Sequence, residues 1–176
     1  MEGFDDFRIA ILKKSSENPR HHSNPLLDAR ESIDCYLSQI SKSQWTLSNS
    51  LFDFLSAQEK KKKKIRVRVV ASINPENIEL AKELARKFSV YHTDGSGGDF
   101  CIIDGALYFY YIENSNHEMA EFHRQLFSKN LSFVKLQQNL FENLLNHAIP
   151  ARDKIKEVEH GIQRDFIKTI QDPTSI

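Results

Sequence analysis

Residues 65–92, IRVRVVASINPENIELAKELARKFSVYH, decide the fold of this chain. Residues 65–73 alternate β-branched and polar side chains, which is typical of a strand. Asn-Pro-Glu at 74–76 predicts a helix start, because it supplies a capping side chain, a proline at the first helical position and an acid. The apolar residues of this helix share one face: Ile78, Ala81, Leu84, Ala85 and Phe88. Residues 89–92 predict the next strand, so the stretch is a strand, a helix and a strand.

Downstream of this stretch, two apolar runs flank a turn. Residues 100–103 and 107–112 are predicted strands, and Asp104-Gly105 between them is a signal for a β-hairpin. The loop before them, residues 94–99, is rich in glycine but lacks the Lys-Ser/Thr ending of a phosphate-binding loop. We interpret it as a flexible loop at the rim of a small-molecule pocket.

Upstream, a helical stretch over 26–31 leads into a buried strand over 33–37. A helix over 50–59 follows and ends in the lysine run 60–64, where cations complement the helix dipole. Strands that alternate with helices predict an α/β fold. The expected architecture is a mixed, largely parallel sheet that helices cover.

A long amphipathic helix is predicted near the C-terminus, over residues 131–149. Its apolar face is marked by residues three or four positions apart: Val134, Gln137, Phe141, Leu144 and Ala148. Pro150 interrupts this helix, because proline lacks the backbone donor that a helix interior needs. Residues 151–160 then form a charged second helix that Gly161 closes.

Composition limits the classes of function. The 176 residues fit one domain, for which we expect an extension and tether over 1–25, an α/β domain over 26–162 and a truncated linker tail over 163–176. The 24 basic and 24 acidic residues give zero net charge, which argues against a surface built wholly for nucleic acid or acidic membranes. Cys35 and Cys101 are too few for a disulfide framework or a four-thiolate zinc site, and indicate a reducing, cytoplasmic setting. No apolar run approaches the roughly 20 residues of a membrane helix, so no membrane insertion is expected.

Other patterns suggest sites that we interpret as structural. The basic stretch 60–68 places seven cations in nine residues and would suit contacts with phosphates. We interpret it as a solvated helix end beside a strand whose arginines face outward, with a DNA-associated regulator as the alternative. His117 and His123 are six positions apart, whereas two zinc-binding histidines on one helical face are four apart. No metal site and no cofactor are therefore predicted.

Three motifs carry a family resemblance. They are IRVRVVASINPENIELAKEL from residue 65, YHTDGSGGDFCIIDG from residue 91 and FVKLQQNLFENLLNHAIPARDKIKEVEHG from residue 133. Over residues 26–162 the chain resembles the sensor domain at the front of many archaeal signal-transduction proteins, among them sensor histidine kinases and helix-turn-helix regulators. That sensor domain is similar to a degenerate phospholipase D fold and to the sugar-sensing half of TrmB-type archaeal regulators.

The resemblance implies a domain that is not an enzyme. A phospholipase D strand carries His-x-Lys-x4-Asp, and with Asp104 as the anchor its histidine and lysine positions are Gly97 and Asp99 here. The nucleophile and the cation that would stabilise a phosphoryl transition state are therefore expected to be missing. The resemblance leaves a ligand pocket near four residues: His92, Asp94, Asp99 and Asp104.

We therefore predict a non-catalytic input domain for signal transduction, which binds a small ligand or a signalling protein partner. Binding would shift the long helix, and its break would pass the shift to residues 151–160. The residues expected to carry this shift are Val134, Gln137, Phe141, Leu144 and Pro150. We expect no kinase or DNA-binding output module in this chain, and we expect a homodimer through the long helix. A catalytically dead phospholipase D-like remnant is the remaining alternative.

Overall fold

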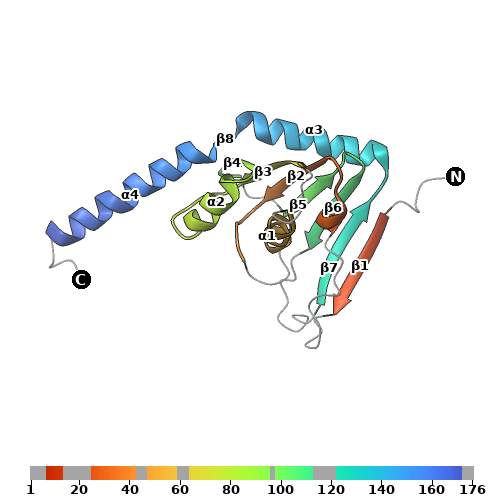
Figure 1. The fold of residues 1–176 in the computed structure, drawn as a ribbon, viewed down its shortest axis with the longest axis horizontal. Coiled ribbons are helices and arrows are strands. Elements are labelled where there is room, and N and C mark those ends of the chain that lie inside the picture. The colour runs from red at the N-terminus through yellow and green to blue at the C-terminus, as the bar shows by residue number, and fades with distance from the viewer. Residues whose placement is uncertain are drawn as a thin grey trace.

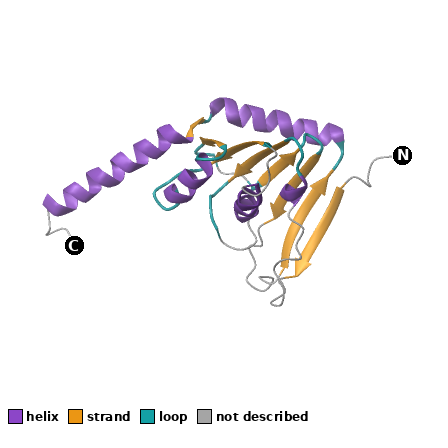
Figure 2. Cartoon of the chain, in the orientation of Figure 1, coloured by secondary structure: helices purple, strands orange, loops and turns teal. Residues whose placement is uncertain are grey.

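The computed structural model describes residues 7–13, 25–42, 47–58, 64–95, 98–112 and 122–171, which form an eight-stranded sheet with helices on its faces (Figures 1 and 2). The order across the sheet is β1-β7-β6-β5-β2-β3-β4-β8. The strands are β1 (Phe7–Lys13), β2 (Ser32–Leu37), β3 (Arg66–Ala71), β4 (Ser89–His92), β5 (Phe100–Ile103), β6 (Leu107–Ile112), β7 (Phe122–Ser128) and β8 (Ile149–Pro150). The helices are the short 3₁₀ turn η2 (Pro25–Asp28), α1 (Leu47–Gln58), α2 (Ile78–Ala85), α3 (Leu131–His147) and α4 (Ala151–Gln171).

The sheet is mixed, as predicted, but its parallel part is small. β2–β3 and β3–β4 pair in parallel, and the other five neighbouring pairs are antiparallel. The expectation of a largely parallel sheet is therefore wrong. Parallel neighbours need a crossover connection, and α1 and α2 supply it only between β2, β3 and β4. β5 and β6 are joined by a short turn, and β6 pairs antiparallel with β7.

The predicted hairpin of β5 and β6 is confirmed, with Ile103 opposite Leu107. The Ala106 N–H donates to the Ile103 carbonyl at 3.0 Å and closes the turn. Asp104 and Gly105 between them both adopt the left-handed region, at φ 53° and 62°. Two successive left-handed residues define a type I′ turn, which the Asp-Gly pair favours.

The predicted helix start at residues 74–76 is a turn instead, and α2 begins at Ile78. The Asn74 side-chain oxygen accepts the backbone N–H groups of Glu76 and Asn77 at 3.0 and 3.2 Å. These are the capping bonds that the sequence predicts for Asn74, because the first N–H groups of a helix have no partner within it, and the regular helix follows from Ile78. The predicted apolar face of α2 is confirmed by its buried residues: Ile78, Ala81 and Leu84.

Each face of the sheet has its own apolar core (Figure 2). In β2 the side chains alternate, so Cys35 and Leu37 join a core with α1, α2 and the first turns of α4. Tyr36 points to the opposite face and joins a core beneath α3. α3 therefore covers one face, and α1, α2 and the start of α4 cover the other.

The predicted break between the C-terminal helices is confirmed, but it begins before Pro150: α3 ends at His147 instead of residue 149, Ala148 is extended, and Pro150 lies in the two-residue strand β8. α4 passes through Gly161 and runs to Gln171, so the prediction that Gly161 closes this helix is wrong. Apart from its chain neighbours and the backbone of α4 itself, nothing lies within 4 Å of the position of a β-carbon at Gly161, so no tertiary contact ends the helix there. In Figure 1 the far half of α4 extends away from the sheet.

Two strands at one edge of the sheet, β1 and β7, have no counterpart among the sequence predictions. β1 pairs with β7 along its whole length, from Phe7 opposite Ser128 to Lys13 opposite Phe122. β7 reads FHRQLFS, which has no clean alternation of apolar and polar residues. The sheet therefore includes residues 7–13 of the expected extension, while the boundaries of the domain stay a prediction. Within the described ranges, no helix has both the length and the apolar character to cross a membrane.

Candidate functional site

Three of the four predicted ligand residues lie at one edge of the sheet, where β2 and β4 end and β5 begins. His92 is the last residue of β4, Asp94 follows it, and Asp99 directly precedes β5. Asp104 lies at the opposite end of β5. Asp99 and Asp104 are five residues of extended chain apart, which corresponds to about 16 Å. The structure therefore separates Asp104 from Asp99. Of the other three residues, His92 and Asp94 are in contact, while Asp99 precedes β5, which β2 and β3 separate from β4.

His92 is buried, and its ring is held in one tautomer. Its Nδ1 accepts the backbone N–H of Ile73 at 3.0 Å, so Nδ1 carries no hydrogen. The Nε2 hydrogen then points to Asp94 Oδ1, also at 3.0 Å. A neutral His92 thus ties the end of β4 to the segment after β3, while the Asp94 side chain is 93% exposed and open to a ligand.

Asp99 is tied to the carboxyl end of β2. The backbone N–H and the hydroxyl of Ser38 donate to Asp99 Oδ1 at 2.7 and 2.6 Å. In the same region the Tyr36 hydroxyl donates to the Gly95 carbonyl at 2.9 Å. Burial, together with the Asp99 charge, raises the pKa of Tyr36. The described parts of the glycine-rich loop are therefore fixed to β2 at both ends.

A row of aromatic rings lies on the α3 face of the sheet near this loop. Tyr36 lies 5.7 Å from Phe100, Phe100 lies 5.6 Å from Tyr108, and Tyr108 lies 6.5 Å from Tyr110, between ring centres. Burial raises the pKa of Tyr108 to about 12, so its hydroxyl stays protonated. Residue types alone do not predict this row, because it runs across β2, β5 and β6. Tyr36, Phe100 and Tyr108 are buried, so the row belongs to the core beneath α3.

Asp104 stabilises the hairpin turn instead of facing a pocket. Its carboxylate accepts the backbone N–H groups of Arg30, Glu31 and Ser32 at 2.9, 2.8 and 2.9 Å. Burial opposes ionisation, but these hydrogen bonds and the Arg30 charge outweigh it and lower the pKa of Asp104. This residue therefore joins the β5–β6 turn to the start of β2.

The predicted signalling residues all lie where the sequence placed them, on α3 and at its break. Val134 and Phe141 are fully buried against the sheet, Gln137 and Leu144 are half-buried, and Pro150 is exposed. β8 pairs with β4, with Ile149 opposite His92 and Pro150 opposite Tyr91. This pairing, which the sequence does not reveal, joins the α3–α4 junction to the strand that carries His92.

The basic stretch 60–68 differs from its predicted arrangement. Arg66 faces outward as expected, with 59% of its side chain exposed, but Arg68 is 16% exposed and forms ion pairs with Asp34 and Glu142. Hydrogen bonds to Asp34 are the main reason that the pKa of Arg68 is raised. Residues 60–63 lie outside the described residues. Of the cations that the structure describes here, Lys64 and Arg66 are exposed.

The phospholipase D pattern can be followed only in part. Gly97, at the histidine position, lies outside the described residues, as do His117 and the side chain of His123. At the lysine position, Asp99 is a carboxylate bound to Ser38. Within the described part of the chain, no three His, Cys, Asp or Glu side chains gather to hold a metal.

The two cysteines face each other across β2 and β5 in the core. Cys35 lies opposite Cys101, and both side chains are fully buried. Burial raises the pKa of Cys35 well above that of a free thiol, and the nearby Cys101 adds to this. Their expected role as buried apolar residues fits this environment.

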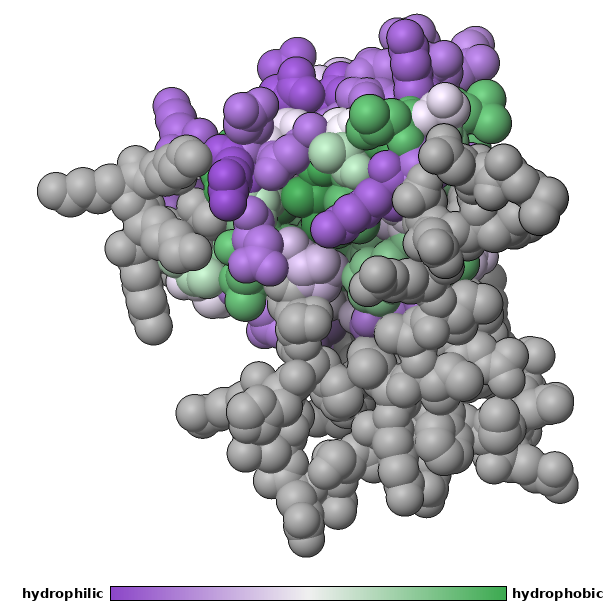
Figure 3. All heavy atoms as spheres, turned by 90° about the vertical axis from the view of Figure 1, so that its right-hand side faces the viewer, coloured by the Kyte–Doolittle hydropathy of each residue, from purple (hydrophilic) through white to green (hydrophobic). Residues whose placement is uncertain are grey.

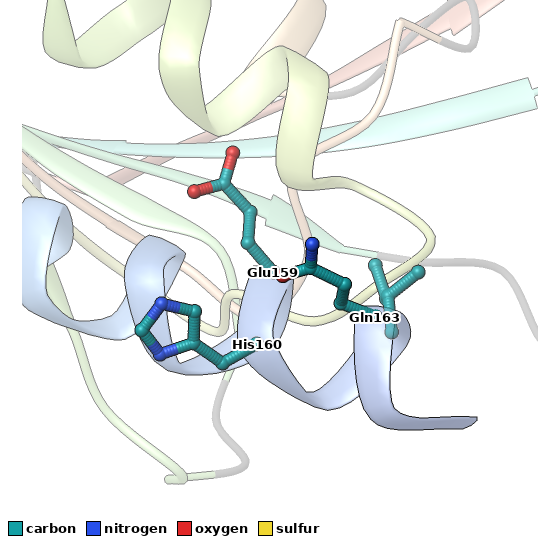
Figure 4. Close-up of a pocket in the computed structure, with 4 residues that line it drawn as sticks. Glu159, His160 and Gln163 are labelled. Carbon is teal, nitrogen blue, oxygen red and sulfur yellow. The ribbon is translucent and has the colours of Figure 1, made fainter. Parts of the chain in front are cut away.

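A shallow surface pocket lies beside α4, where Glu159, His160, Ile162 and Gln163 line it (Figure 4). Glu159 also forms an ion pair with Lys82 of α2 at 2.9 Å. The lining side chains come from α4 alone, so this hollow is open on its other sides.

Solved structures with a similar fold include a phospholipase D family member and an archaeal chromatin protein. Nuc from Salmonella typhimurium, a phospholipase D family member, matches 82% of this chain and 98% of its own, with a TM-score of 0.59 and 11% identity. NucT from Helicobacter pylori matches 82% and 99%, with a TM-score of 0.56 and 14% identity. TrmBL2, an archaeal chromatin protein, matches 81% and 53%, with a TM-score of 0.52 and 16% identity. The chain thus spans about half the length of TrmBL2.

At the level of sequence, the chain matches no protein-family profile and no curated protein. The structural likeness nevertheless defines the fold. This chain adopts a phospholipase D-like α/β fold, and its structural neighbours include a TrmB-like protein.

Proposed function

We propose that this chain is a non-catalytic input domain for signal transduction, which binds a small ligand or a protein partner at the edge formed by His92, Asp94 and Asp99. The observation that carries the proposal is the pairing of Ile149 with His92. A ligand that moves the end of β4 also moves β8, because the two strands are paired through their backbones. The junction between α3 and α4 is thus coupled directly to the candidate site.

α4 is suited to carry such a movement away from the domain. Ala151 and Ile155 are buried in the core, and Glu159 is held by Lys82 of α2. From Glu159 to Gln171 the helix extends by twelve further residues, about 18 Å. A small displacement at β8 therefore becomes a larger displacement at the far end of this helix.

Asp99 takes the place of the lysine in the phospholipase D pattern, and this supports a role in binding instead of catalysis. Phosphoryl transfer needs a cation to stabilise the charge that develops on the transferred group. Asp99 carries a negative charge there, and Ser38 holds it in place. A carboxylate at this position would repel a phosphodiester.

Native mass spectrometry of the gently purified protein tests the proposal. We expect a small molecule of defined mass to remain bound, and we expect Asp94→Ala or Ser38→Ala to lose it. Asp28→Ala is the control, since Asp28 is exposed on η2, outside the candidate edge. A protein without bound ligand would restrict the proposal to a protein partner. Hydrolysis of bis(p-nitrophenyl) phosphate by the purified chain would contradict it.

A DNA-associated regulator is the second candidate. The similarity of the fold to that of TrmBL2, whose reported structure shows a mode of DNA binding, favours it. The internal ion pairs of Arg68 weaken it, because they remove one cation from the basic stretch.

A further inference from the structure

Exposed apolar surface is concentrated on α3 and on the strand that follows it. Among the described residues, the large hydrophobic side chains that are exposed are Leu27, Leu131, Leu136, Leu140, Ile149 and Ile162. Four of these six belong to α3 or β8. Leu136 is 62% exposed and Leu140 is 49% exposed, although both lie within a regular helix. Figure 3 shows apolar side chains exposed among hydrophilic ones on one face of the molecule.

α3 uses only part of its apolar face to cover the sheet. Val134 and Phe141 are fully buried, and Glu142 on the adjoining flank is bound to Arg68 of the sheet. Successive residues of a helix are turned by about 100°, so Leu136 and Leu140 lie on the flank away from Glu142. The half-buried Phe133 and Leu144 lie between this exposed flank and the sheet.

On the exposed flank of α3, the apolar residues are spaced symmetrically about Leu140. Leu136 and Leu144 lie four positions before and after it, and Phe133 and His147 lie seven positions before and after it. Two antiparallel copies of α3 that cross at Leu140 would therefore place Leu136 of one copy opposite Leu144 of the other. This self-complementary pattern is what a twofold interface between identical chains requires.

The charge of α3 also favours a second copy as the occupant. Lys135 and Glu142 are the formally charged Lys, Arg, Asp or Glu residues of its sequence, and Glu142 is engaged by Arg68. Nucleic acid or an acidic membrane would need a cluster of cations here, and the core of a protein interface is depleted in charge. Because the whole chain has zero net charge, two copies do not repel each other.

We propose that the chain forms a twofold homodimer in which α3 packs antiparallel against α3 of a second copy, with Leu140 at the centre. The exposed leucines are four residues apart, so they form a ridge of the kind that packs into an equivalent ridge at a crossing angle of about −50°. This dimer does not depend on the proposed function, since it needs neither a ligand nor a signalling partner. Two single helices form a small interface, so we expect a reversible, concentration-dependent dimer.

Sedimentation velocity of the full chain over a concentration series tests the proposal. We expect the wild-type chain to shift from monomer to dimer, and Leu140→Glu to weaken the dimer at least tenfold, because two carboxylates would meet on the twofold axis. Leu27→Glu and Ile162→Glu are matched controls, since both replace exposed apolar residues elsewhere, and they should keep the dimer. Circular dichroism checks that each variant remains folded.

Crosslinking gives a second readout that does not depend on destabilising the interface. Leu140→Cys should crosslink to itself with a short bis-maleimide, whereas Lys135→Cys should not, and the buried Cys35 and Cys101 should not react. A wild-type chain that stays monomeric at every concentration would overturn the proposal. So would a dimer that Ile162→Glu disrupts and Leu140→Glu does not, or a monomer that co-sediments with phosphatidylcholine vesicles.

Discussion

Arg68 of β3 holds Asp34 of β2 in a bidentate ion pair, with its Nε and Nη2 atoms at 2.7 and 2.8 Å from the two carboxylate oxygens. The same guanidinium donates to Glu142 of α3 at 2.6 and 3.1 Å and lies 5.2 Å from the centre of the Phe141 ring. The Asp34 side chain is only 2% exposed. One cation therefore neutralises a buried acid and holds α3 over the sheet.

Arg68→Met should lower the free energy of unfolding by about 3–5 kcal/mol, because it leaves a buried carboxylate without its partner. Glu142→Gln should cost no more than about 1 kcal/mol, since Glu142 is 43% exposed and solvent screens its charge. Urea unfolding at neutral pH measures both changes. Arg66→Met is the control: Arg66 lies 4.0 Å from Asp34 but is mostly exposed, so its loss should stay within about 0.5 kcal/mol. Equal losses for Arg66→Met and Arg68→Met would contradict this account.

The sequence predicts those parts of the fold that depend on neighbours along the chain. The buried strand at 33–37, the Asp104-Gly105 turn and the break at Pro150 are all signalled by local patterns, and the structure confirms them. The contact of Arg68 with Glu142 joins residues 74 positions apart, and no local pattern reports where α3 crosses the sheet. The edge strand β1 is hidden for the same reason, because its partner β7 lies more than 100 residues downstream.

The candidate site shows the same division. The family resemblance alone implies a pocket near His92, Asp94, Asp99 and Asp104, and no local pattern places these residues together. The resemblance includes Asp104 because it aligns this residue with a functional motif. Its actual partners, the backbone groups of residues 30–32, are joined to it only by the register of β2 against β5.

Asp104→Asn should make the protein less stable at neutral pH and remove part of its sensitivity to acid. The pKa of Asp104 is lowered in the folded state, so its stabilising contribution is present above the unfolded value of about 3.9 and is lost as the pH falls through the folded value. Asparagine tolerates the left-handed conformation of this position, so the substitution tests mainly the charge. Urea unfolding between pH 7 and 2 should show the two stability curves converging below about pH 4. Curves that remain parallel down to pH 2 would show that the charge of Asp104 contributes nothing.

Two glycine substitutions should have effects of opposite sign. In Gly98→Ala the new β-carbon would overlap the ring and hydroxyl of Tyr110, so we expect a loss of about 1–3 kcal/mol. In Gly161→Ala the new β-carbon meets nothing, and alanine favours the helix by about 0.5–1 kcal/mol, so the helical signal of α4 should rise. Thermal unfolding and circular dichroism measure these effects. Destabilisation by both variants would mean that the surroundings of Gly161 are tighter than the structure shows.

The basic stretch should not support strong binding to DNA. With zero net charge and Arg68 engaged internally, we expect no measurable binding of a random duplex at an ionic strength of about 0.15 M. Fluorescence anisotropy over a range of salt concentrations tests this, with Lys135→Gln as a control outside the stretch. Tight binding with a steep salt dependence, which disappears when Lys60–Lys64 are replaced by glutamine, would instead establish the DNA-associated alternative.

The coupling between β4 and the α3–α4 junction can be tested without knowing the ligand. His92→Phe removes the acceptor for the Ile73 N–H, which should cost about 1–3 kcal/mol and loosen the end of β4. Because Ile149 pairs with His92, hydrogen exchange should become faster at residues 149–155 than at β5, which lies across β2 and β3 from β4. Asp94→Asn should leave exchange unchanged, since it keeps the acceptor oxygen on an exposed side chain.

A general loss of stability would also accelerate exchange, so the comparison needs a variant of similar stability. Ile33→Val in β2 removes one buried methylene group and should cost about 0.5–1.5 kcal/mol, and β2 lies between β5 and β3 without pairing with β4 or β8. Faster exchange at residues 149–155 in His92→Phe but not in Ile33→Val would establish that the end of β4 controls the junction. If both variants accelerate exchange there equally, the β4–β8 pairing is not a specific link, and the route from the candidate site to α4 must be given up.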